Sequence, residues 1–490
     1  MSVSQVDRRT VLKAGLAAAL LTTGCSDSKP ANAGPGDGLT AAGPDWNGFR
    51  RGLNGKLYRP GETGYAASHQ LFNPRFDAIQ PAGVVRISTV DDVRESVLFA
   101  RKNKLVCVPK GGGHSYVGAS TIGNGLVVDV GSAHTISYAD NVVTVGAGAK
   151  LYDVHVLLDK YGRSLPTGTC PTVGIAGLAL GGGLGIHTRT YGLTSDRVLS
   201  MQVVTADGVF RNVSPTQNAD LYWALRGGGG GNLAIVTSLR LATIGAGKLG
   251  FFRLVWPEAK AAAVVQGWQK FAHDAPTTSW GNLHIVAESN GTLSIHVLGV
   301  STTGSAAAAA AQLESFVGSK ASSRSITVKT HLEAVKYLGG GTTSPRTPFL
   351  AGSDVLRGPM DAATINGLLG AVKAAARAKV EASVILDPLG GQAAKQPAGG
   401  SAWPWRSALG TIQWYSDLPP NASAAALRAA QNFITSGHHA VTKASAGGYV
   451  NYLEAGRSVN SYYGSSLGRL RTVKKKYDPT NFFRTSYTFS

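Results

Sequence analysis

Residues 108–120, VPKGGGHSYVGAS, place a histidine directly behind three glycines and after a short apolar run. Glycine loses more backbone entropy on folding than other residues, so it is used where a chain turns sharply or approaches another group closely. His114 would therefore stand where a ligand could lie against the main chain. A tight turn that carries a surface histidine is an alternative interpretation of the same residues. Taken alone, the stretch leaves both interpretations open.

A second glycine-rich stretch, residues 166–185, reads PTGTCPTVGIAGLALGGGLG and contains Cys170. It has so little side-chain bulk that a flat ligand could lie on its backbone. The usual phosphate-binding motifs are absent: no G-x-x-x-x-G-K-[ST] occurs, and no G-x-G-x-x-G lies between a strand and a helix. GAGAKL, which begins at Gly146, lacks the third glycine. The sequence therefore offers two soft nucleophiles, His114 and Cys170, on glycine loops of another kind.

Two other catalytic patterns can be excluded. GSSLG at residues 464–468 matches G-x-S-x-G, but an α/β-hydrolase needs a histidine after the serine, and the last histidine is His439. No H-E-x-x-H occurs, and we predict no metal site. His438 and His439 are predicted to form an exposed pair at a helix end.

Composition describes a globular protein of 490 residues, with 43% hydrophobic and 15% charged residues. The net charge is +19, but the basic residues are scattered and the longest basic run is three lysines at residues 474–476. Without a zinc-finger spacing or a basic heptad region, no nucleic-acid partner is predicted. Three cysteines, Cys25, Cys107 and Cys170, make no disulfide framework. Cys107 is predicted to be a buried hydrophobic residue.

The N-terminus has the features of an export signal. Arg8 and Arg9 precede the short apolar run at residues 14–23, which is too short to span a bilayer. This pattern resembles a Tat signal. LTTGC, ending at Cys25, is an imperfect lipobox, and ANA at residues 31–33 offers a cleavage site instead. We expect an exported, extracytoplasmic protein, lipid-anchored if Cys25 is modified.

Residues 1–45 are predicted to be this Tat-type signal and a flexible tether. Alternating short helices and strands with glycine loops predict an α+β domain over residues 46–245. Residues 246–446 alternate strand-like runs with alanine-rich helical stretches, which predicts a second domain with an antiparallel sheet covered by helices. Residues 447–490 form a C-terminal segment that is both aromatic and polar.

Five segments carry a resemblance to a known family: KGGGHSY, GTCPTVGIAGLALGGGLG, YGLTSDRVLSMQVVTADG, LYWALRGGGGGNLAIVTSLRL and YVNY…YYG…RL..VK..YDPTNFF. They are similar to the FAD-linked oxidases of the vanillyl-alcohol-oxidase superfamily, and more narrowly to its berberine-bridge-enzyme-like branch. The match runs in order from about residue 73 to the C-terminus and is weak in residues 246–400. It implies a PCMH-type FAD-binding domain, a substrate domain, and a C-terminal segment that returns to the FAD domain.

The resemblance also implies a bicovalent FAD, joined to His114 at its 8α-methyl group and to Cys170 at its C6. Neutral imidazole and thiolate are the side chains able to add to an electron-poor isoalloxazine. In this branch a valine and a glycine at the positions of Val173 and Gly168 accompany reaction with O2, which favours an oxidase over a dehydrogenase. The predicted cofactor-binding set comprises the loop glycines and their neighbours: His114, Cys170, Gly111, Gly112, Gly113, Ser115, Gly168, Val173, Gly174, Gly177, Gly181, Gly182, Gly183, Ile235, Val236 and Asn451.

For catalysis, Gln413 in TIQW and Tyr452 in YVNY match two family positions that face the substrate. Alcohol oxidation needs a base for the hydroxyl proton while hydride leaves the carbon. Tyr452 is the predicted base, provided that neighbours stabilise its phenolate, because the pKa of tyrosine is ordinarily about 10. Gln413 would orient the substrate, and Tyr116 would also face the pocket. Simple packing in an aromatic core is the alternative for Gln413 and Tyr452.

The sequence thus predicts a flavoprotein oxidase that transfers hydride from an alcohol carbon of a sugar, oligosaccharide or secondary metabolite to FAD. Reoxidation by molecular oxygen would give H2O2. One alternative is oxidative cyclisation or dehydrogenation of a natural-product scaffold. Another is a non-catalytic, exported binding lipoprotein with a degenerate flavin fold. The expected partners are the small-molecule substrate and O2, with membrane contact only through a lipidated Cys25.

Overall fold

Two sheets dominate the first half of the computed structural model, which describes residues 43–485 and 487–489. The first has the order β1-β2-β4-β3, in which β2, β4 and β3 are parallel and β1 is antiparallel to β2. Every residue of β4 is buried, as expected for the central strand of a parallel sheet. The strands are β1 (Lys56–Tyr58), β2 (Gly83–Arg86), β3 (Cys107–Lys110) and β4 (Leu126–Asp129).

Helix α3 (Val90–Lys102) links β2 to β3. It begins with a capping box: the hydroxyl of Thr89 accepts from the backbone N–H of Asp92, and the carboxylate of Asp92 accepts from the N–H of Thr89. The glycine stretch around His114 follows β3 directly. A buried parallel strand therefore ends in the loop that carries this histidine.

The second sheet is antiparallel, in the order β5-β6-β10-β8-β9. Its strands are β5 (Ile136–Ala139), β6 (Val142–Gly146), β8 (Val198–Thr205), β9 (Phe210–Val213) and β10 (Ala234–Ala242). The glycine stretch around Cys170 lies between β7 (Arg163–Ser164), which pairs with β11 (Ile244–Gly245), and helix α6 (Thr188–Tyr191), and it includes α5 (Ile175–Leu180). Helix α4 (Leu151–Asp159) precedes β7.

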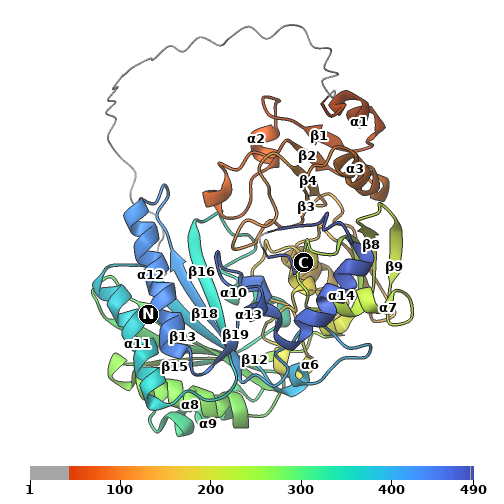
Figure 1. The fold of residues 1–490 in the computed structure, drawn as a ribbon. Helices are drawn as coiled ribbons and strands as arrows, with labels where there is room; N and C mark the ends of the chain where they lie inside the picture. Colours follow the sequence, from red (N-terminus) through yellow and green to blue (C-terminus); the bar gives the residue numbers. More distant parts are fainter. Residues whose placement is uncertain (1–42, 486, 490) are drawn as a thin grey trace, which may run out of the picture. The chain divides into compact units, whose positions relative to one another are not determined.

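A larger antiparallel sheet follows, in the order β15-β12-β14-β13-β17-β18-β16-β19. Its eight strands are β12 (Leu249–Trp256), β13 (Ser279–Ala287), β14 (Leu293–Ser301), β15 (Ser323–Lys329), β16 (Phe349–Leu356), β17 (Ala382–Pro388), β18 (Gly410–Asp417) and β19 (Ser445–Gly447). Four helices cover one face: α8 (Ala261–Asp274), α9 (Ala306–Val317), α11 (Ala362–Arg377) and α12 (Ala424–Val441). Figure 1 shows these helices together on one side of the strands.

The two faces of this large sheet differ in chemistry. On β13, Leu283 and Ile285 are fully buried in the core beneath the helices, whereas Trp280, Asn282 and His284 point the other way. Side chains alternate between the faces of a strand, so the face away from the helices carries the polar groups of Asn282 and His284 beside apolar side chains such as Leu298. This face is one wall of the cavity described below.

The C-terminal segment ends in α13 (Asn460–Tyr463) and α14 (Leu467–Tyr477). Helix α14 packs against α7 (Ala219–Leu225), as Figure 1 also shows. The buried ammonium of Lys474 donates to the carbonyl of Asn232 at 2.7 Å and pairs with Asp478 at 2.6 Å. The last residues of the chain therefore lie against the strands and glycine loops of the first half. The remaining helices are α1 (Trp46–Gly52), α2 (Tyr65–Ser68) and α10 (His331–Leu338).

The predicted α+β class and the antiparallel sheet under helices are confirmed. The domain limits at residues 45, 245 and 446 stay a prediction. The predicted export signal and most of the tether lie outside the described residues. Within residues 43–485 and 487–489, no helix is long and apolar enough to cross a membrane.

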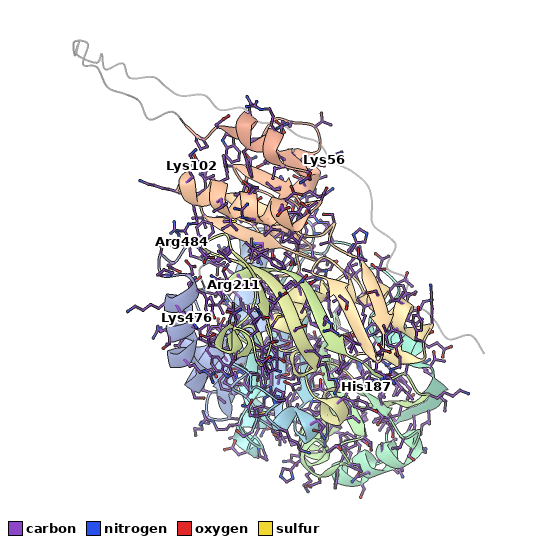
Figure 2. All side chains as sticks on the ribbon, turned by 90° about the vertical axis from the view of Figure 1, so that its right-hand side faces the viewer. Lys56, Lys102, His187, Arg211, Lys476 and Arg484 are labelled. Carbon is purple, nitrogen blue, oxygen red and sulfur yellow. The ribbon has the colours of Figure 1, made fainter. Side chains whose placement is uncertain are left out.

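Basic side chains are distributed over many elements. Figure 2 shows Lys56, Lys102, Arg211, Lys476 and Arg484 at separate places on the side that it views. Two of them are paired with carboxylates, Arg211 with Asp207 at 2.6 Å and Lys476 with Asp220 at 2.7 Å. The labelled basic side chains are therefore spread over this side, and two of the five form ion pairs with carboxylates there.

Candidate active site

A cavity of about 540 Å³ lies between the glycine loops and the polar face of the eight-stranded sheet. One wall comes from the loops around His114 and Cys170, a second from β13, β17 and β18, and a third from residues 449–453 of the C-terminal segment. Most of the predicted site residues line it: Gly111, Gly112, Gly113, His114, Ser115, Tyr116, Gly168, Cys170, Val173, Gly174, Gly177, Val236, Gln413, Asn451 and Tyr452. The fold thus brings together residues from three distant parts of the chain.

The two glycine loops touch backbone to backbone. A Cβ on Gly174 would lie 2.5 Å from the nitrogen of Gly112, and a Cβ on Gly112 would overlap the nitrogen of Gly174. Neither position can carry a side chain without moving the other loop. Gly113 adds a positive φ of +69°. The glycines before His114 therefore serve close approach and a tight turn at once, which places His114 and Cys170 on the same cavity.

Four predicted residues lie behind the cavity wall. Ile235 is fully buried in the core of the first half. Gly181, Gly182 and Gly183 pack against the C-terminal segment instead: the N–H of Gly183 donates to the hydroxyl of Tyr449 at 2.9 Å, and a Cβ on Gly181 would overlap the amide of Asn451. These three glycines hold the segment that carries Tyr452.

His114 is held as a neutral imidazole. Its Nε2 lies 2.9 Å from the hydroxyl of Thr172, and its ring stacks on Phe72 at 4.0 Å and 19°. Burial, with a smaller effect of Lys150, lowers the pKa of His114 to about 4. The free thiol of Cys170 is partly exposed to the cavity. Both predicted attachment residues are thus available as nucleophiles.

The three predicted catalytic residues form one contact group. The amide of Gln413, on β18, donates to the hydroxyl of Tyr116 at 2.7 Å. The ring of Tyr116 stacks on that of Tyr452 at 5.1 Å, with an angle of 3° between the ring planes. Tyr449 meets Tyr452 edge-on at 4.8 Å. The structure therefore fixes two phenols and an amide on one side of the cavity.

Tyr452 does not receive the stabilisation that a phenolate needs. Burial raises its pKa well above the ordinary value, and the nearby acids Asp387, Tyr449 and Cys170 raise it further. Asp387, at the end of β17, also lines the cavity. Burial raises the pKa of Asp387 to about 7, which suits a proton acceptor near neutral pH. Asp387 is the one charged residue in the strand ASVILDP, and no motif in the sequence marks it as a site residue.

The sheet contributes two further polar groups that the sequence analysis missed. Asn282 Oδ1 and His284 Nε2 are buried and have no hydrogen-bond partner among the described residues, and both residues line the cavity. His284 stacks on His296 at 4.8 Å and 11°. Burial, with His296 and Arg253, lowers the pKa of His284 to about 3, so it is neutral. Unpaired buried polar atoms are costly, so a water molecule or a ligand in the cavity would satisfy these two atoms.

Comparison with known proteins identifies the family. A family model described as FAD binding domain matches residues 81–214, and one described as berberine and berberine like matches residues 448–487. The carbohydrate oxidase of Microdochium nivale is 30% identical over 456 residues, which cover 86% of this chain and 90% of that enzyme. The chain belongs to the berberine-bridge-enzyme-like branch of FAD-linked oxidases. It is an FAD-dependent oxidoreductase.

Other similar proteins match over nearly the same length of the chain. An uncharacterised FAD-linked oxidoreductase of Bacillus subtilis, YgaK, is 28% identical over 452 residues, or 88% of this chain and 96% of that protein. The crystal structure of the Microdochium nivale enzyme with a substrate analogue superposes with a TM-score of 0.82, over 90% of this chain and 98% of that one, at 26% identity. The Acremonium strictum glucooligosaccharide oxidase gives 0.80 at 25% identity, over 91% and 98%. That enzyme is described as carrying 6-S-cysteinyl, 8α-N1-histidyl FAD.

The residues present fit FAD. A neutral His114 and a free Cys170 face one cavity, and the contact between Gly112 and Gly174 leaves the loop backbones bare of side chains. Backbone N–H groups of such loops can bind the cofactor's polar atoms without obstruction by Cβ atoms. His114 and Cys170 would hold the cofactor, and Gln413, Tyr452 and the sheet face would remain for the substrate.

Proposed function

We propose that this protein is an exported flavoprotein oxidase that oxidises an alcohol carbon of a sugar or oligosaccharide, with FAD joined covalently to His114 and Cys170. The carrying observation is that one cavity holds both candidate attachment residues and an acid–base group, Asp387, whose pKa is raised to about 7. The relatives named carbohydrate oxidase and glucooligosaccharide oxidase support the substrate class. Bicovalent attachment is supported by the description of the latter enzyme's flavin.

FAD supplies the redox step when bound, because it takes hydride from the alcohol carbon and returns two electrons to O2, which becomes H2O2. The hydroxyl proton leaves separately, so the alcohol loses one hydride and one proton and becomes a carbonyl. We assign that proton to Asp387, which is ionised above about pH 7. Tyr452 stays protonated, because its pKa is raised, and binds the substrate oxygen as a hydrogen-bond partner. This assignment moves the role of base from Tyr452 to Asp387.

Substrate recognition is assigned to the polar face of the sheet. The unpartnered Asn282 Oδ1 would accept a hydrogen bond from a hydroxyl group of the substrate, and His284 Nε2 would accept or donate one. A neutral histidine can do either, depending on its tautomer. Trp280, on the same face of β13, offers an aromatic surface beside them. Hydroxyl groups of a ligand would satisfy these two unpartnered atoms, which an apolar scaffold would leave unpaired.

The proposal also includes access of O2 to the flavin and export of the protein. Gly168 and Val173 are small and line the cavity, which supports access of O2. Export is supported by the twin arginines Arg8 and Arg9 and the short apolar run behind them. Processing would then occur at residues 31–33 or by lipidation of Cys25.

A substrate panel tests the proposal. Purified yellow protein is mixed with mono- and oligosaccharides and with apolar secondary-metabolite alcohols, and O2 consumption and H2O2 release are measured, with catalase as the control. We expect one H2O2 for each sugar oxidised. Turnover only with an artificial electron acceptor would contradict the oxidase. Turnover of apolar alcohols alone would contradict the carbohydrate substrate.

A further inference from the structure

Four charged side chains form a closed group behind the wall that carries Tyr449 and Tyr452. Asp354 lies on β16, His438 on α12, and Glu454 and Arg457 on the C-terminal segment. His438 Nδ1 is 2.6 Å from Asp354, and its Nε2 is 2.5 Å from Glu454. Arg457 completes the circle, at 3.1 Å from Asp354 and 2.8 Å from Glu454. We call these four residues the charge ring.

His438 is therefore not half of the exposed pair that the sequence predicted, because both of its ring nitrogens face carboxylates. Only 22% of its side chain is exposed, and the carboxylate side chains of Asp354 and Glu454 are 3% and 9% exposed. Its neighbour His439 is exposed, so the prediction holds for that residue alone.

The geometry requires a protonated imidazole. An ionised carboxylate only accepts hydrogen bonds, and a neutral imidazole has one N–H, so one of the two contacts would be repulsive without the second proton. With His438 protonated, two positive and two negative charges balance. The pKa of His438 is raised to about 9, because the stabilising contacts of Asp354 and Glu454 outweigh the burial that would lower it. Asp354, on β16, and Glu454, on the C-terminal segment, are the charged groups in contact with it, and Arg457 contacts the other oxygen of each carboxylate.

The ring is joined to the backbone of the two tyrosines through Ser353. Glu454 accepts from the N–H of Ser353 at 2.9 Å. The hydroxyl of Ser353 in turn accepts from the N–H of Tyr449 at 2.9 Å and donates to the carbonyl of Tyr452 at 3.3 Å. A Cβ on Gly352 would collide with the carboxylate of Glu454, so the strand is bare at the point where the ring lies against it. Loss of the ring would leave the segment held at the cavity only from the other side, where Tyr449 and Asn451 contact Gly183 and Leu178.

We propose that the charge ring of Asp354, His438, Glu454 and Arg457 is a positioning site, which holds Tyr449 and Tyr452 at the cavity wall only while His438 carries its proton. The tyrosines' part in catalysis rests on the proposed function, but the holding of the segment does not. His438 contributes stability that is fully present below its ordinary value of 6.5 and is lost as the pH rises through about 9. We therefore expect the cavity wall at Tyr449 and Tyr452 to become disordered when the pH rises above about 9.

Three measurements on the flavin-loaded protein test this role, and a global loss of stability is recognised because it would speed exchange throughout the protein and not in residues 449–457 alone. Histidine NMR should show His438 titrating near pH 9. Hydrogen exchange, corrected for its intrinsic pH dependence, should show residues 449–457 losing protection above that pH. The rate of flavin reduction by substrate without O2 should fall over the same range, by about tenfold or more, since misplaced groups react slowly.

His438→Gln is the deciding variant, and the exposed His439→Gln on the same helix is its matched control. An amide has a carbonyl oxygen where the imidazolium has its second N–H, so it cannot serve both carboxylates. We expect exchange in residues 449–457 to be fast at all pH values in H438Q and to be unchanged from the wild type in H439Q. Flavin reduction in H438Q should be slow already at pH 8, without the alkaline step.

A normal titration of His438 near pH 6.5, or full protection of residues 449–457 in H438Q, would overturn the proposal. If no alcohol reduces the flavin, the proposed function fails, while NMR and hydrogen exchange still decide the ring. If H438Q does not fold, the wild-type titration and the pH dependence of its exchange give the answer.

Discussion

Replacement of Asp387 by asparagine separates the base from the rest of the site. The side chain keeps its size, but it can no longer take a proton. General-base catalysis contributes about 10²- to 10⁴-fold, so flavin reduction by substrate should slow by that factor. In the wild type this rate should rise with pH through about 7, as Asp387 ionises. D387N should lack that step while still binding flavin.

The same change has a calculable effect on stability. Burial raises the pKa of Asp387 from 3.8 to about 7, and each pKa unit is worth about 1.4 kcal/mol, so the ionised carboxylate opposes folding by up to about 4 kcal/mol. Because water in the cavity screens part of this, we expect about 2 kcal/mol. A carboxyl group whose pKa is higher in the folded than in the unfolded protein destabilises the fold once the pH exceeds the unfolded pKa of 3.8. The destabilisation grows between pH 3.8 and about 7 and is complete above pH 7. D387N should therefore be more stable than the wild type at pH 8 and equal to it in acid.

Stopped-flow flavin reduction and thermal unfolding, each across pH, measure the two effects. Glu381→Gln, at the exposed residue before β17, is the control that removes a carboxylate outside the cavity. A D387N protein with the wild-type rate and the wild-type pH dependence would refute the assignment of Asp387 as base.

Three further variants probe the cavity walls. Gly112→Ala should force the loops apart at Gly174 and lower both the unfolding temperature and the flavin absorbance per protein; full flavin loading would speak against the close contact. His284→Leu removes a ligand partner and should raise KM for oligosaccharides about tenfold while kcat stays within twofold, in steady-state H2O2 assays. Gln413→Leu frees the hydroxyl of Tyr116 and should lower kcat/KM about tenfold; an unchanged value would reduce Gln413 to packing.

Local sequence signals predicted the elements that depend on neighbouring residues. The short helices expected in residues 46–245 include α3, which Thr89 and Asp92 cap, and the alanine-rich helical stretches expected in residues 246–446 include α9. The glycine stretches were recognised because their composition is unusual in itself. Capping, periodicity and glycine content are all visible within a few residues, so these predictions needed no tertiary information.

Long-range pairings could not be predicted in this way. Asp387 is an aspartate near a strand end in the sequence, and it becomes a cavity group only because β17 pairs with β13 and β18. Asn282 and His284 face the cavity because of the alternation along β13. The carboxylates that enclose His438 stand at distant positions of the chain, so a histidine pair at a helix end gave no sign of burial.

Acid precipitation followed by peptide mass analysis tests the covalent attachment of FAD to His114 and Cys170 most directly. The protein is precipitated with acid, washed and digested, and the flavin-bearing peptides are identified by mass. The account predicts that the yellow colour stays with the precipitate, and that a single flavin joins the peptide of His114 to the peptide of Cys170. Flavin released entirely into the acid supernatant, or peptides of His114 and Cys170 without added mass, would contradict it.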